Sequence, residues 1–316
     1  MKNKVLLAGA GYMGMEYAKV LSAMNVDFEV AGRGEKNISA LKERFPAVKS
    51  FTGGIENISL TEREYTHVII AAGVEHLSSL ANLCLEKGIP NLLVEKPGGL
   101  FLHELEMMQT LAAEKKASVF IAFNRRFYRS AEIASGIINA DGGISSIHFE
   151  FTEWTGTIDV SKYSKETLAR WIAANSSHVI DFAFHLGGKP DQLHAVVRGN
   201  AVPWHPSGSV FTGSGITVKK IPFSYHANWG APGRWSVELF TPRHRLCFRP
   251  MEKLMVQEKN SVEIKDVPGD YSPDLQYKPG LFSQVKSFLE SPSDPRLCNL
   301  SEHTENFRFY EKIGGY

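Results

Sequence analysis

Long hydrophobic runs, clustered cysteines and an excess of charge of either sign are all missing from this 316-residue sequence. No apolar run approaches the roughly 20 residues that a membrane-spanning helix needs, so we expect no transmembrane segment. The three scattered cysteines, Cys84, Cys247 and Cys298, predict no disulfide framework and are typical of a reducing compartment. A net charge of +1 gives no electrostatic reason to expect a nucleic-acid or membrane-surface partner.

The composition and the beginning of the chain are typical of a cytoplasmic globular protein. Hydrophobic residues make up 43% of the sequence and charged residues 22%, as in soluble globular chains. A core strand pattern begins at once, which leaves no room for the charged and apolar regions of a signal peptide. From the length we expect two domains of ordinary size, and from the missing signal a cytoplasmic location.

Residues 4–14, KVLLAGAGYMG, carry the strongest local signal in the sequence. A strand-type run leads into glycines spaced as GxGxxG, and a helical pattern follows without a break. This order is the context of a dinucleotide-binding fingerprint, in which the diphosphate lies over free N–H groups of the helix. The alternative is a structural turn without a ligand. We predict that the turn binds the cofactor through Gly9, Gly11, Tyr12, Met13 and Gly14.

The end of the second expected strand, Asp27–Ala31, favours NADP over NAD. NAD-binding folds place Asp or Glu at this point, about 20 residues after the glycines, to bind the ribose 2′-hydroxyl. Here Gly32 removes the repulsion of a 2′-phosphate, and the guanidinium of Arg33 is suited to bind that phosphate. Two alternatives stay open: Arg33 as an ordinary exposed arginine, and Glu35 as the ligand of the ribose.

Strands and helices are expected to alternate through the first half of the chain. We predict helices over 38–45, 76–87 and 101–115, and strands over 66–71, 91–94 and 118–123. These lengths are typical of a doubly wound parallel sheet, which binds ligands beyond the carboxyl ends of its strands. Such ends are followed by Ala72 and His76 and by Glu95, Lys96 and Pro97.

Two motifs together, GAGYMG at 9–14 and VEKPGG at 94–99, resemble the Gfo/Idh/MocA family of glucose–fructose oxidoreductase, inositol dehydrogenase and rhizopine-catabolism proteins. Further matches are AGVEH at 72–76, FNRRF at 123–127, SHVID at 177–181 and the helical pattern at 299–313. The resemblance implies an α/β protein with an N-terminal Rossmann domain over 1–122. It also implies a C-terminal substrate-binding and oligomerisation domain over 123–316, and NAD(P)-dependent hydride transfer on a sugar, a polyol or a related carbon.

In this family the lysine of EKP lies close to the nicotinamide and the substrate, which implies that Lys96 is a catalytic and cofactor-side residue. An ammonium beside the reacting oxygen hydrogen-bonds it, stabilises developing negative charge and relays a proton when its pKa is lowered. Ala72, His76 and Glu95 are expected on the same cofactor side. The alternative for Lys96 is an ordinary surface lysine at a strand end.

From about residue 125 the hydrophobic pattern changes to a period of two. We predict strands over 145–153, 192–198, 209–212, 215–221, 236–240 and 245–249. They indicate a large, mainly antiparallel sheet with one face covered by helices. Because the other face is then available to pair subunits, a homo-oligomer, either a dimer or a tetramer, is expected.

A helical pattern over 168–186 places His178 and Asp181 on one face. The family often carries Asp-x-x-x-His-x-x-Asp here, which aligns His178 with the histidine and Asp181 with the second acid. Ala174 replaces the first acid, so Asn175 or Asp181 is left to orient the histidine. We expect His178 to bind substrate and act as acid or base, with Asp181 and Asn175 in support. The alternative is a buried or capping histidine. No third ligand with metal spacing is visible, so no metal is expected.

Asn124 and Arg126 follow the strand end at 118–123 and are expected to bind substrate. Arg126 then holds a hydroxyl, carboxylate or phosphate; the alternative, a salt bridge between the domains, is equally compatible with the sequence.

Together these features predict an NADP- or NAD-dependent dehydrogenase or reductase that acts on the hydroxyl or carbonyl carbon of a small molecule. The substrate class is a sugar, a sugar derivative (nucleotide sugars included) or a polyol. Two alternatives stay open. One is a catalytically silent dinucleotide-binding sensor, motivated by Ala174, and the other is a glycosidase or epimerase that recycles its NAD.

Overall fold

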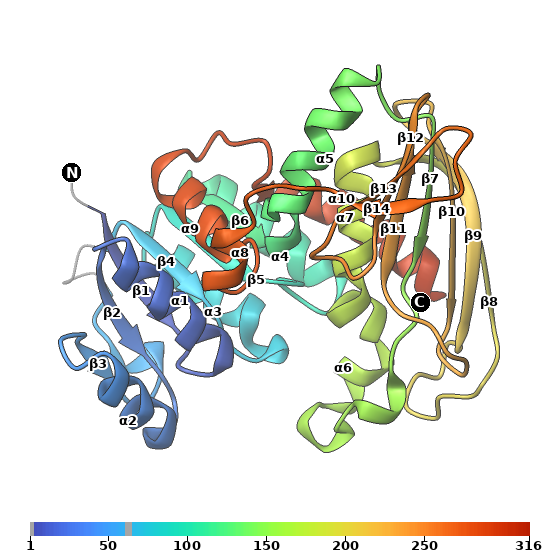
Figure 1. The fold of residues 1–316 in the computed structure, drawn as a ribbon. Helices are drawn as coiled ribbons and strands as arrows, with labels where there is room; N and C mark the ends of the chain where they lie inside the picture. Colours follow the sequence, from blue (N-terminus) through green and yellow to red (C-terminus); the bar gives the residue numbers. More distant parts are fainter. Residues whose placement is uncertain (1–2, 61–64) are drawn as a thin grey trace. The chain divides into compact units, whose positions relative to one another are not determined.

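A computed structural model describes residues 3–60 and 65–316 and divides the chain into two compact units (Figure 1). Unit 1 comprises Met1–Ala122 and Gln276–Thr304, and unit 2 comprises Phe123–Leu275 and Glu305–Tyr316. The first boundary falls at the residue that the sequence analysis expects. The expected C-terminal domain over 123–316 differs from unit 2, because residues 276–304 pack with the N-terminal sheet instead.

Unit 1 is built on a seven-stranded sheet in the order β15-β6-β5-β4-β1-β2-β3. Its strands are β1 Lys4–Ala8, β2 Asp27–Ala31, β3 Ser50–Phe51, β4 His67–Ile70, β5 Asn91–Glu95, β6 Ser118–Ala122 and β15 Cys298–Asn299. All pairs are parallel except β15 with β6. The predicted doubly wound sheet is thereby confirmed, and an antiparallel strand from the C-terminal part of the chain extends it.

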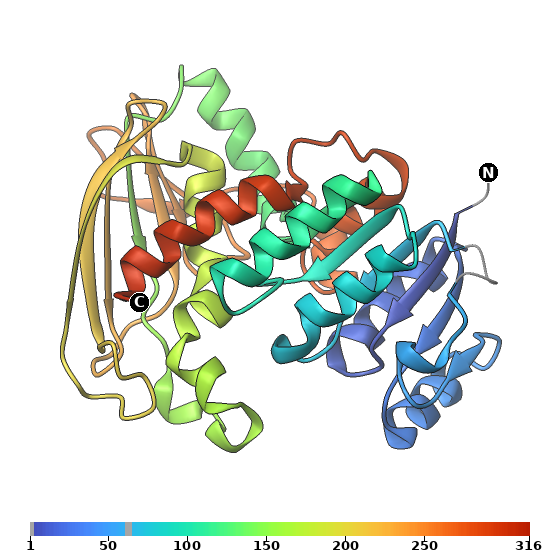
Figure 2. The ribbon, with the colours of Figure 1, turned by 180° about the vertical axis from the view of Figure 1, so that it is seen from behind.

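Helices cover both faces of this sheet. They are α1 Tyr12–Ala23, α2 Glu35–Arg44, α3 Leu77–Glu86, α4 Leu102–Lys115 and α9 Leu281–Glu290. α1 and α9 lie on one face, and α3 and α4 lie on the other (Figures 1 and 2). Central strands are therefore buried on both sides: Val5, Leu6 and Leu7 are all fully buried, which explains their continuous apolar run.

Unit 2 is built on an eight-stranded sheet in the order β14-β13-β12-β11-β7-β10-β9-β8. Its strands are β7 Ser146–Glu150, β8 Pro190–Arg198, β9 Val210–Thr217, β10 Pro222–Asn228, β11 Ser236–Phe240, β12 His244–Phe248, β13 Met255–Glu258 and β14 Ile264–Asp266. Only β10 with β7 pairs in parallel, so the prediction of a mainly antiparallel sheet is confirmed.

One face of this sheet is covered and the other is polar. The remaining helices are α5 Arg129–Ala140, α6 Lys165–Ala169, α7 Ser177–Gly187, α8 Ser272–Gln276 and α10 Leu300–Gly314. α5 and α7 lie on the covered face (Figure 1). There Phe184 of α7 packs edge-on against Phe149 and Phe223. The alternation predicted from the sequence reflects this one-sided burial.

The predicted strands 209–212 and 215–221 are in fact one strand, β9, and the sequence analysis missed its partner β10. Gly213 and Gly215 interrupt the hydrophobic pattern and suggested a break. A Cβ at either position would overlap a backbone carbonyl of β8, that of His194 or Gln192, and also an aromatic ring of β10, Tyr225 or Phe223. The glycines therefore make room for close contacts with both neighbouring strands rather than ending β9.

The predicted helix over 168–186 is also divided. α6 ends at Ala169, residues Ile172–Ser176 form a π-helix, and α7 begins at Ser177. Ala174 therefore lies in the π-helix, and His178 lies in the α-helix that follows it. Such π segments are frequent at functional sites.

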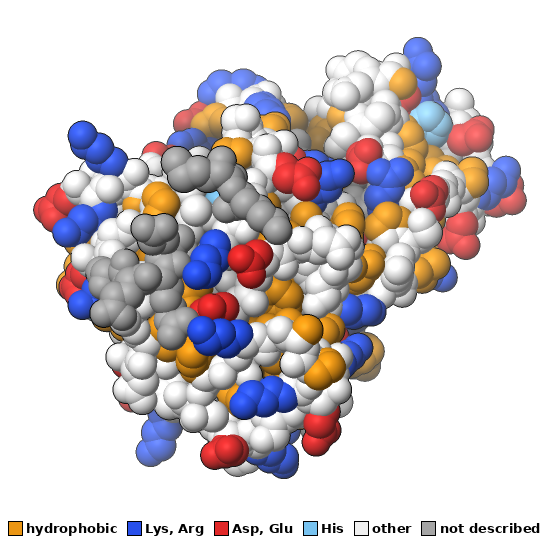
Figure 3. Space-filling view, turned by 90° about the vertical axis from the view of Figure 1, so that its left-hand side faces the viewer, with side chains coloured by type: hydrophobic (Ala, Val, Ile, Leu, Met, Phe, Trp, Pro, Cys, Tyr) orange, Lys and Arg blue, Asp and Glu red, His pale blue; other side chains and the backbone are white. Residues whose placement is uncertain are grey.

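Within residues 3–60 and 65–316 no helix combines the length and the apolar character needed to cross a bilayer. On the face of unit 1 that Figure 3 presents, basic and acidic side chains lie interspersed. This mixture is consistent with the near-neutral net charge of the sequence.

Candidate functional site

A cavity of about 360 Å³ lies at the carboxyl ends of β1, β2 and β4 in unit 1. Three loops line it: the glycine turn after β1, residues 32–34 after β2, and residues 71–73 after β4. β1 lies between β2 and β4 in the sheet, so the chain connections diverge to opposite sides at this point. Open α/β sheets bind ligands at such a switch point.

Each of the three glycines in the turn occupies its position for a different structural reason. Gly9 has a φ of 128°, and a Cβ there would overlap the carbonyl of Ala71. A Cβ on Gly14 would overlap the carbonyl of Gly9, so this glycine lets α1 pack closely on the turn. Gly11 is different, because a Cβ there would meet no atom within 4 Å. The packing of the turn therefore does not require a glycine at position 11. The space beside Gly11 is open to the cavity instead.

The beginning of α1 is prepared for an anion. Gly11 is its N-cap, no side chain caps it, and its first turn contains no acidic residue. The N–H groups of the first helical turn and the positive end of the helix dipole are therefore left for a ligand. Gly11, Tyr12 and Met13 all line the cavity, as the fingerprint predicts.

Arg33 lines the same cavity at the end of β2. Its Nη1 donates to Nε2 of His76 at 3.0 Å, and its Nη2 donates to Oε1 of Glu56 at 3.3 Å. A Cβ on Gly54 would overlap the Glu56 carboxylate, so Gly54 makes room for that acid. Arg33 and His76 were predicted on the cofactor side, whereas Glu56, in the short 3-10 helix Ile55–Asn57, carries no recognisable motif and was not predicted.

At the beginning of α2, Asn37 rather than Glu35 lines the cavity. Glu35, the alternative ribose ligand, lies in the first turn of α2 and does not line the cavity, whereas Asn37 of the same helix does. Ala72 lines the cavity as expected. The sequence signal that was available for Asn37 is its position one turn after the Gly32–Arg33 pair.

Glu95 is bound to α1 rather than to the cavity. Its Oε1 accepts a hydrogen bond from the hydroxyl of the fully buried Tyr17 at 2.7 Å. Burial raises the pKa of Glu95, although the Tyr17 bond and the positive charges of Lys96 and Lys278 act in the opposite direction. Burial, with the nearby Glu95 charge, also raises the pKa of Tyr17. Glu95 therefore joins the end of β5 to α1.

Lys96 follows the last residue of β5 and is half-buried. The Lys96–Pro97 peptide bond is cis, and the carbonyl of Pro97 accepts a hydrogen bond from Nε2 of His303 at 2.8 Å. Neither Lys96 nor Glu95 lines the 360 Å³ cavity itself. The structure thus places the predicted catalytic lysine at a carboxyl strand end of the sheet, in a turn held by the C-terminal segment.

In unit 2 the predicted residues Arg126 and Asp181 are joined to each other. Nε and Nη2 of Arg126 donate to Oδ2 and Oδ1 of Asp181 at 2.8 and 2.6 Å. The two side chains are only 1% and 0% exposed. Arg126 was expected to bind substrate and Asp181 to support His178. The salt bridge that Arg126 forms lies within unit 2, whereas the alternative was a salt bridge between the domains, and the substrate-binding roles of both residues stay predictions.

His178 lies near the beginning of α7 and is buried at 9% exposure. Its ring packs edge-on against Phe123 at a centroid distance of 5.9 Å and lies 6.3 Å from the ring of Trp235. Asn124 is buried in a short 3-10 turn, Asn124–Phe127, that precedes α5. Both predicted residues are therefore on the covered, helical side of unit 2.

The carboxylate that approaches the π-helix comes from Glu153, which the sequence analysis missed. Its Oε1 accepts hydrogen bonds from Nδ2 of Asn175 at 3.0 Å and from Oγ of Ser176 at 2.6 Å, and its side chain is 3% exposed. Asn175, expected at the substrate, is thus bound to an acid. A signal was present: residues 147, 149 and 151 are buried, and Glu153 continues the same period of two.

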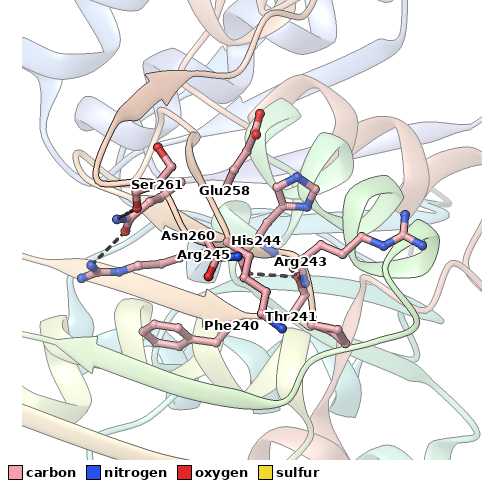
Figure 4. A pocket seen from close by; sticks show the side chains of 11 residues that line it. Phe240, Thr241, Arg243, His244, Arg245, Glu258, Asn260 and Ser261 are labelled. Carbon is pink, nitrogen blue, oxygen red and sulfur yellow. Dashed lines mark hydrogen bonds between the residues drawn. The ribbon is translucent and has the colours of Figure 1, made fainter.

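A second cavity, of about 520 Å³, lies in unit 2 between the β11–β12 turn and the end of β13 (Figure 4). Its polar side chains are bound to one another or to neighbours. Oγ1 of Thr241 donates to Asp141 at 2.6 Å, His244 Nδ1 lies 2.6 Å from the same carboxylate, and Arg245 donates to Glu238. These contacts stabilise the turn, and no predicted site residue lies there.

Comparisons with known proteins agree with the geometry of unit 1. Residues 3–123 match the model of an oxidoreductase family with an NAD-binding Rossmann fold, the Gfo/Idh/MocA family. The match is confined to these N-terminal residues, which lie mostly in unit 1. A comparison with curated proteins found no match.

Solved structures of the same fold extend over both units. Levoglucosan dehydrogenase in complex with NADH is 17% identical with a TM-score of 0.79, over 99% of this chain and 96% of that one. An oxidoreductase from Agrobacterium radiobacter in complex with NAD+, L-tartaric acid and magnesium is 14% identical with a TM-score of 0.78, over 98% and 95%. UDP-N-acetylglucosamine 3-dehydrogenase GnnA from Acidithiobacillus ferrooxidans is 14% identical with a TM-score of 0.74, over 99% and 97%. At these identities the likeness shows the fold.

Proposed function

We propose that this protein is an NAD(P)-dependent oxidoreductase that transfers a hydride to or from the hydroxyl or carbonyl carbon of a sugar, a sugar derivative or a polyol. The observation that carries the proposal is the cavity of unit 1. It combines an uncapped helix beginning, a glycine with open space beside it and an arginine at the end of β2. These features fit the diphosphate and ribose of a dinucleotide.

The proposed roles in unit 1 follow from the donor groups. The N–H groups at the beginning of α1 bind the diphosphate, and a bound nicotinamide dinucleotide supplies or accepts the hydride. The amine of Lys96 hydrogen-bonds the substrate oxygen, stabilises its negative charge as the proton leaves, and passes that proton on. Glu95 and Tyr17 fix the strand end from which Lys96 extends.

In unit 2, His178 is proposed to bind the substrate hydroxyl and to exchange its proton. Glu153 holds Asn175 and Ser176, and so fixes the π-helix that leads to His178. Asp181 is proposed to act through Arg126 on the position of α7 rather than on the substrate. This revises its sequence-based role, because both of its oxygens accept from Arg126.

NADP is the proposed preferred dinucleotide. Gly32 carries no acid that would repel a 2′-phosphate, and Arg33 lies at the cavity with its guanidinium held by His76 and Glu56. A 2′-phosphate has three oxygens that accept from a guanidinium, whereas a 2′-hydroxyl has one. Arg33 therefore distinguishes the two dinucleotides more strongly than the turn glycines do.

The test measures the change in nicotinamide absorbance over a panel of sugars, polyols and nucleotide sugars. Lys96→Ala is expected to lower kcat by roughly 10²–10⁴-fold and to leave dinucleotide affinity unchanged, because general acid–base catalysis contributes about this much. Lys115→Ala is the matched control, since Lys115 is exposed on α4 of the same unit. Unchanged turnover in Lys96→Ala would remove Lys96 from the mechanism. No dinucleotide binding by the wild type would overturn the proposed function.

A dinucleotide-binding sensor without turnover is the second candidate. It is favoured by Ala174, which stands in the π-helix where the family often has an acid. Tight dinucleotide binding combined with no oxidation or reduction of any offered alcohol or ketone is the result that would support it.

A further inference from the structure

Hydrogen-bond donors outnumber acceptors around Trp235 in unit 2. The guanidinium of Arg125 lies 4.9 Å from the centre of the Trp235 ring, and that of Arg234 lies 4.7 Å from it. Trp235 is 6% exposed, and its indole N–H donates to none of the described residues. Nε of Arg125 is also buried without an acceptor among them. Buried donors without acceptors are uncommon in native proteins, so they indicate a missing ligand.

Protein carboxylates balance only part of this positive charge. Nη1 of Arg234 lies 3.8 Å from Oε2 of Glu153, whose other oxygen accepts from Asn175 and Ser176. No carboxylate pairs with Arg125 in the described part of the chain; its guanidinium lies over Trp235 and Tyr128 instead. The neighbouring Arg126 offers a contrast, since Asp181 neutralises it fully. The positive charge of Arg125 is therefore available to pair with an anionic ligand.

The cluster formed by Arg125, Arg234 and Trp235 lies next to His178, the histidine proposed to act on the substrate. The rings of Trp235 and His178 are 6.3 Å apart. On its other side Arg234 stacks on Trp154 at 4.5 Å, and Trp154 is 56% exposed. A ligand bound to the arginines is therefore bordered by His178 and by an exposed aromatic surface, which suits the apolar face of a sugar ring.

We propose that the substrate carries an oxyanion, a phosphate or a carboxylate, that binds to Arg125, Arg234 and the indole N–H of Trp235. This inference rests on the proposed function, and it narrows the substrate from sugars and polyols in general to anionic ones. Guanidinium groups bind both oxyanions through paired charge-assisted hydrogen bonds. The indole N–H supplies a donor for a further oxygen.

The test uses isothermal titration calorimetry on protein saturated with NADP+. The bound dinucleotide then occupies the proposed phosphate-binding site at the beginning of α1, so the probes do not bind there. The probes are glucose 6-phosphate, glucuronate and glucose, which share a sugar ring and differ in the charged group. We expect one or both charged probes to bind at least about 10-fold more tightly than glucose, with an affinity that falls as salt is added. The two charged probes distinguish a phosphate ligand from a carboxylate ligand.

Variants locate the effect. Arg125→Gln and Arg234→Gln are each expected to weaken the charged probe by about 10-fold and to leave glucose unchanged, because each removes a charge-assisted hydrogen bond. Trp235→Phe keeps an aromatic ring and removes the N–H, so we expect a smaller loss of about 3–5-fold. Arg198→Gln is the matched control, since Arg198 is an exposed arginine at the end of β8.

Three results overturn the inference. The first is glucose binding as tightly as the charged probes, or none of the three binding at all. The second is an equal loss in Arg198→Gln and Arg125→Gln, and the third is no loss in any cluster variant whose circular dichroism is native. Dinucleotide affinity, followed by protein fluorescence, separates this failure from that of the proposed function, which requires NADP+ or NAD+ to bind whatever the substrate charge.

Discussion

The buried pair of Arg126 and Asp181 allows the sharpest prediction about stability. Asp181→Asn keeps the shape of the side chain and removes its charge, so the buried guanidinium of Arg126 loses the carboxylate that accepts two of its hydrogen bonds. Both bonds of the pair are short, at 2.8 and 2.6 Å, and neither side chain is more than 1% exposed. Water therefore does not replace the lost carboxylate.

The expected magnitude follows from this burial. Removing one partner of a fully buried ion pair costs about 3–5 kcal/mol, because the remaining charge stays desolvated. With a urea m value of about 2 kcal/mol/M, a loss of about 4 kcal/mol lowers the midpoint of unfolding by about 2 M. The matched control is Asp191→Asn, which removes an exposed partner of Lys220 at 2.7 Å and is expected to cost about 0–1 kcal/mol.

Urea unfolding followed by tryptophan fluorescence measures both variants. The double variant Arg126→Met/Asp181→Leu removes both charges and is expected to recover most of the lost stability. A loss below about 1 kcal/mol in Asp181→Asn, or the same loss in the exposed control, would refute the reasoning. A double variant that regains its stability but not its kcat would show that Arg126 or Asp181 also acts in the reaction, as the sequence predicts for both.

Three further predictions concern the cavity and the C-terminal segment. Gly14→Ala is expected to weaken dinucleotide binding by at least about 10-fold and to lower stability by about 1–3 kcal/mol, because its Cβ would overlap the Gly9 carbonyl; native affinity and midpoint would contradict this. Arg33→Ala is expected to weaken NADP+ by about 10–100-fold and NAD+ by less than about 3-fold in fluorescence titrations; equal losses would argue against a 2′-phosphate ligand. Partial burial acts to raise the pKa of Asp294, but its hydrogen bonds, chiefly from Arg296, lower that pKa to about 2. The carboxylate therefore stabilises the fold above about pH 4 and loses this contribution as the pH falls toward 2. Asp294→Asn should cost up to about 2 kcal/mol near pH 7 and nothing near pH 2, measured as urea midpoints at both values.

Local patterns in the sequence were enough to predict the parallel core of unit 1, but not that residues 276–304 add α9 and the antiparallel strand β15 to it. Its central strands are buried on both faces, so they appear as continuous apolar runs such as residues 5–8. Gly9 and Gly14 are needed for close backbone contacts within one strand–turn–helix unit, which makes the motif recognisable from the sequence. Arg33 is likewise predictable, because the end of β2 lies at a defined distance from the glycines.

For unit 2 the sequence predicted the type of sheet, but not the bounds of all its strands. The period-two pattern identifies the one-sided burial of an antiparallel sheet, whichever strands pair. It does not show that Gly213 and Gly215 lie inside a strand, because these glycines are required by close contacts with the backbone of β8 and the aromatic rings of β10.

The sequence by itself determined the alternation of strands and helices over residues 4–122, the class of the second sheet and the place of the dinucleotide turn, because those signals depend on neighbours within a few residues. Only the tertiary structure decided the partners of the charged groups. Arg126 binds Asp181, Glu95 binds Tyr17, and Glu153 reaches the π-helix, over separations of 55, 78 and 22–23 residues. A buried charge is stable only beside a suitable partner, and which side chains meet in the interior is decided by the packing of whole elements rather than by spacing along the chain.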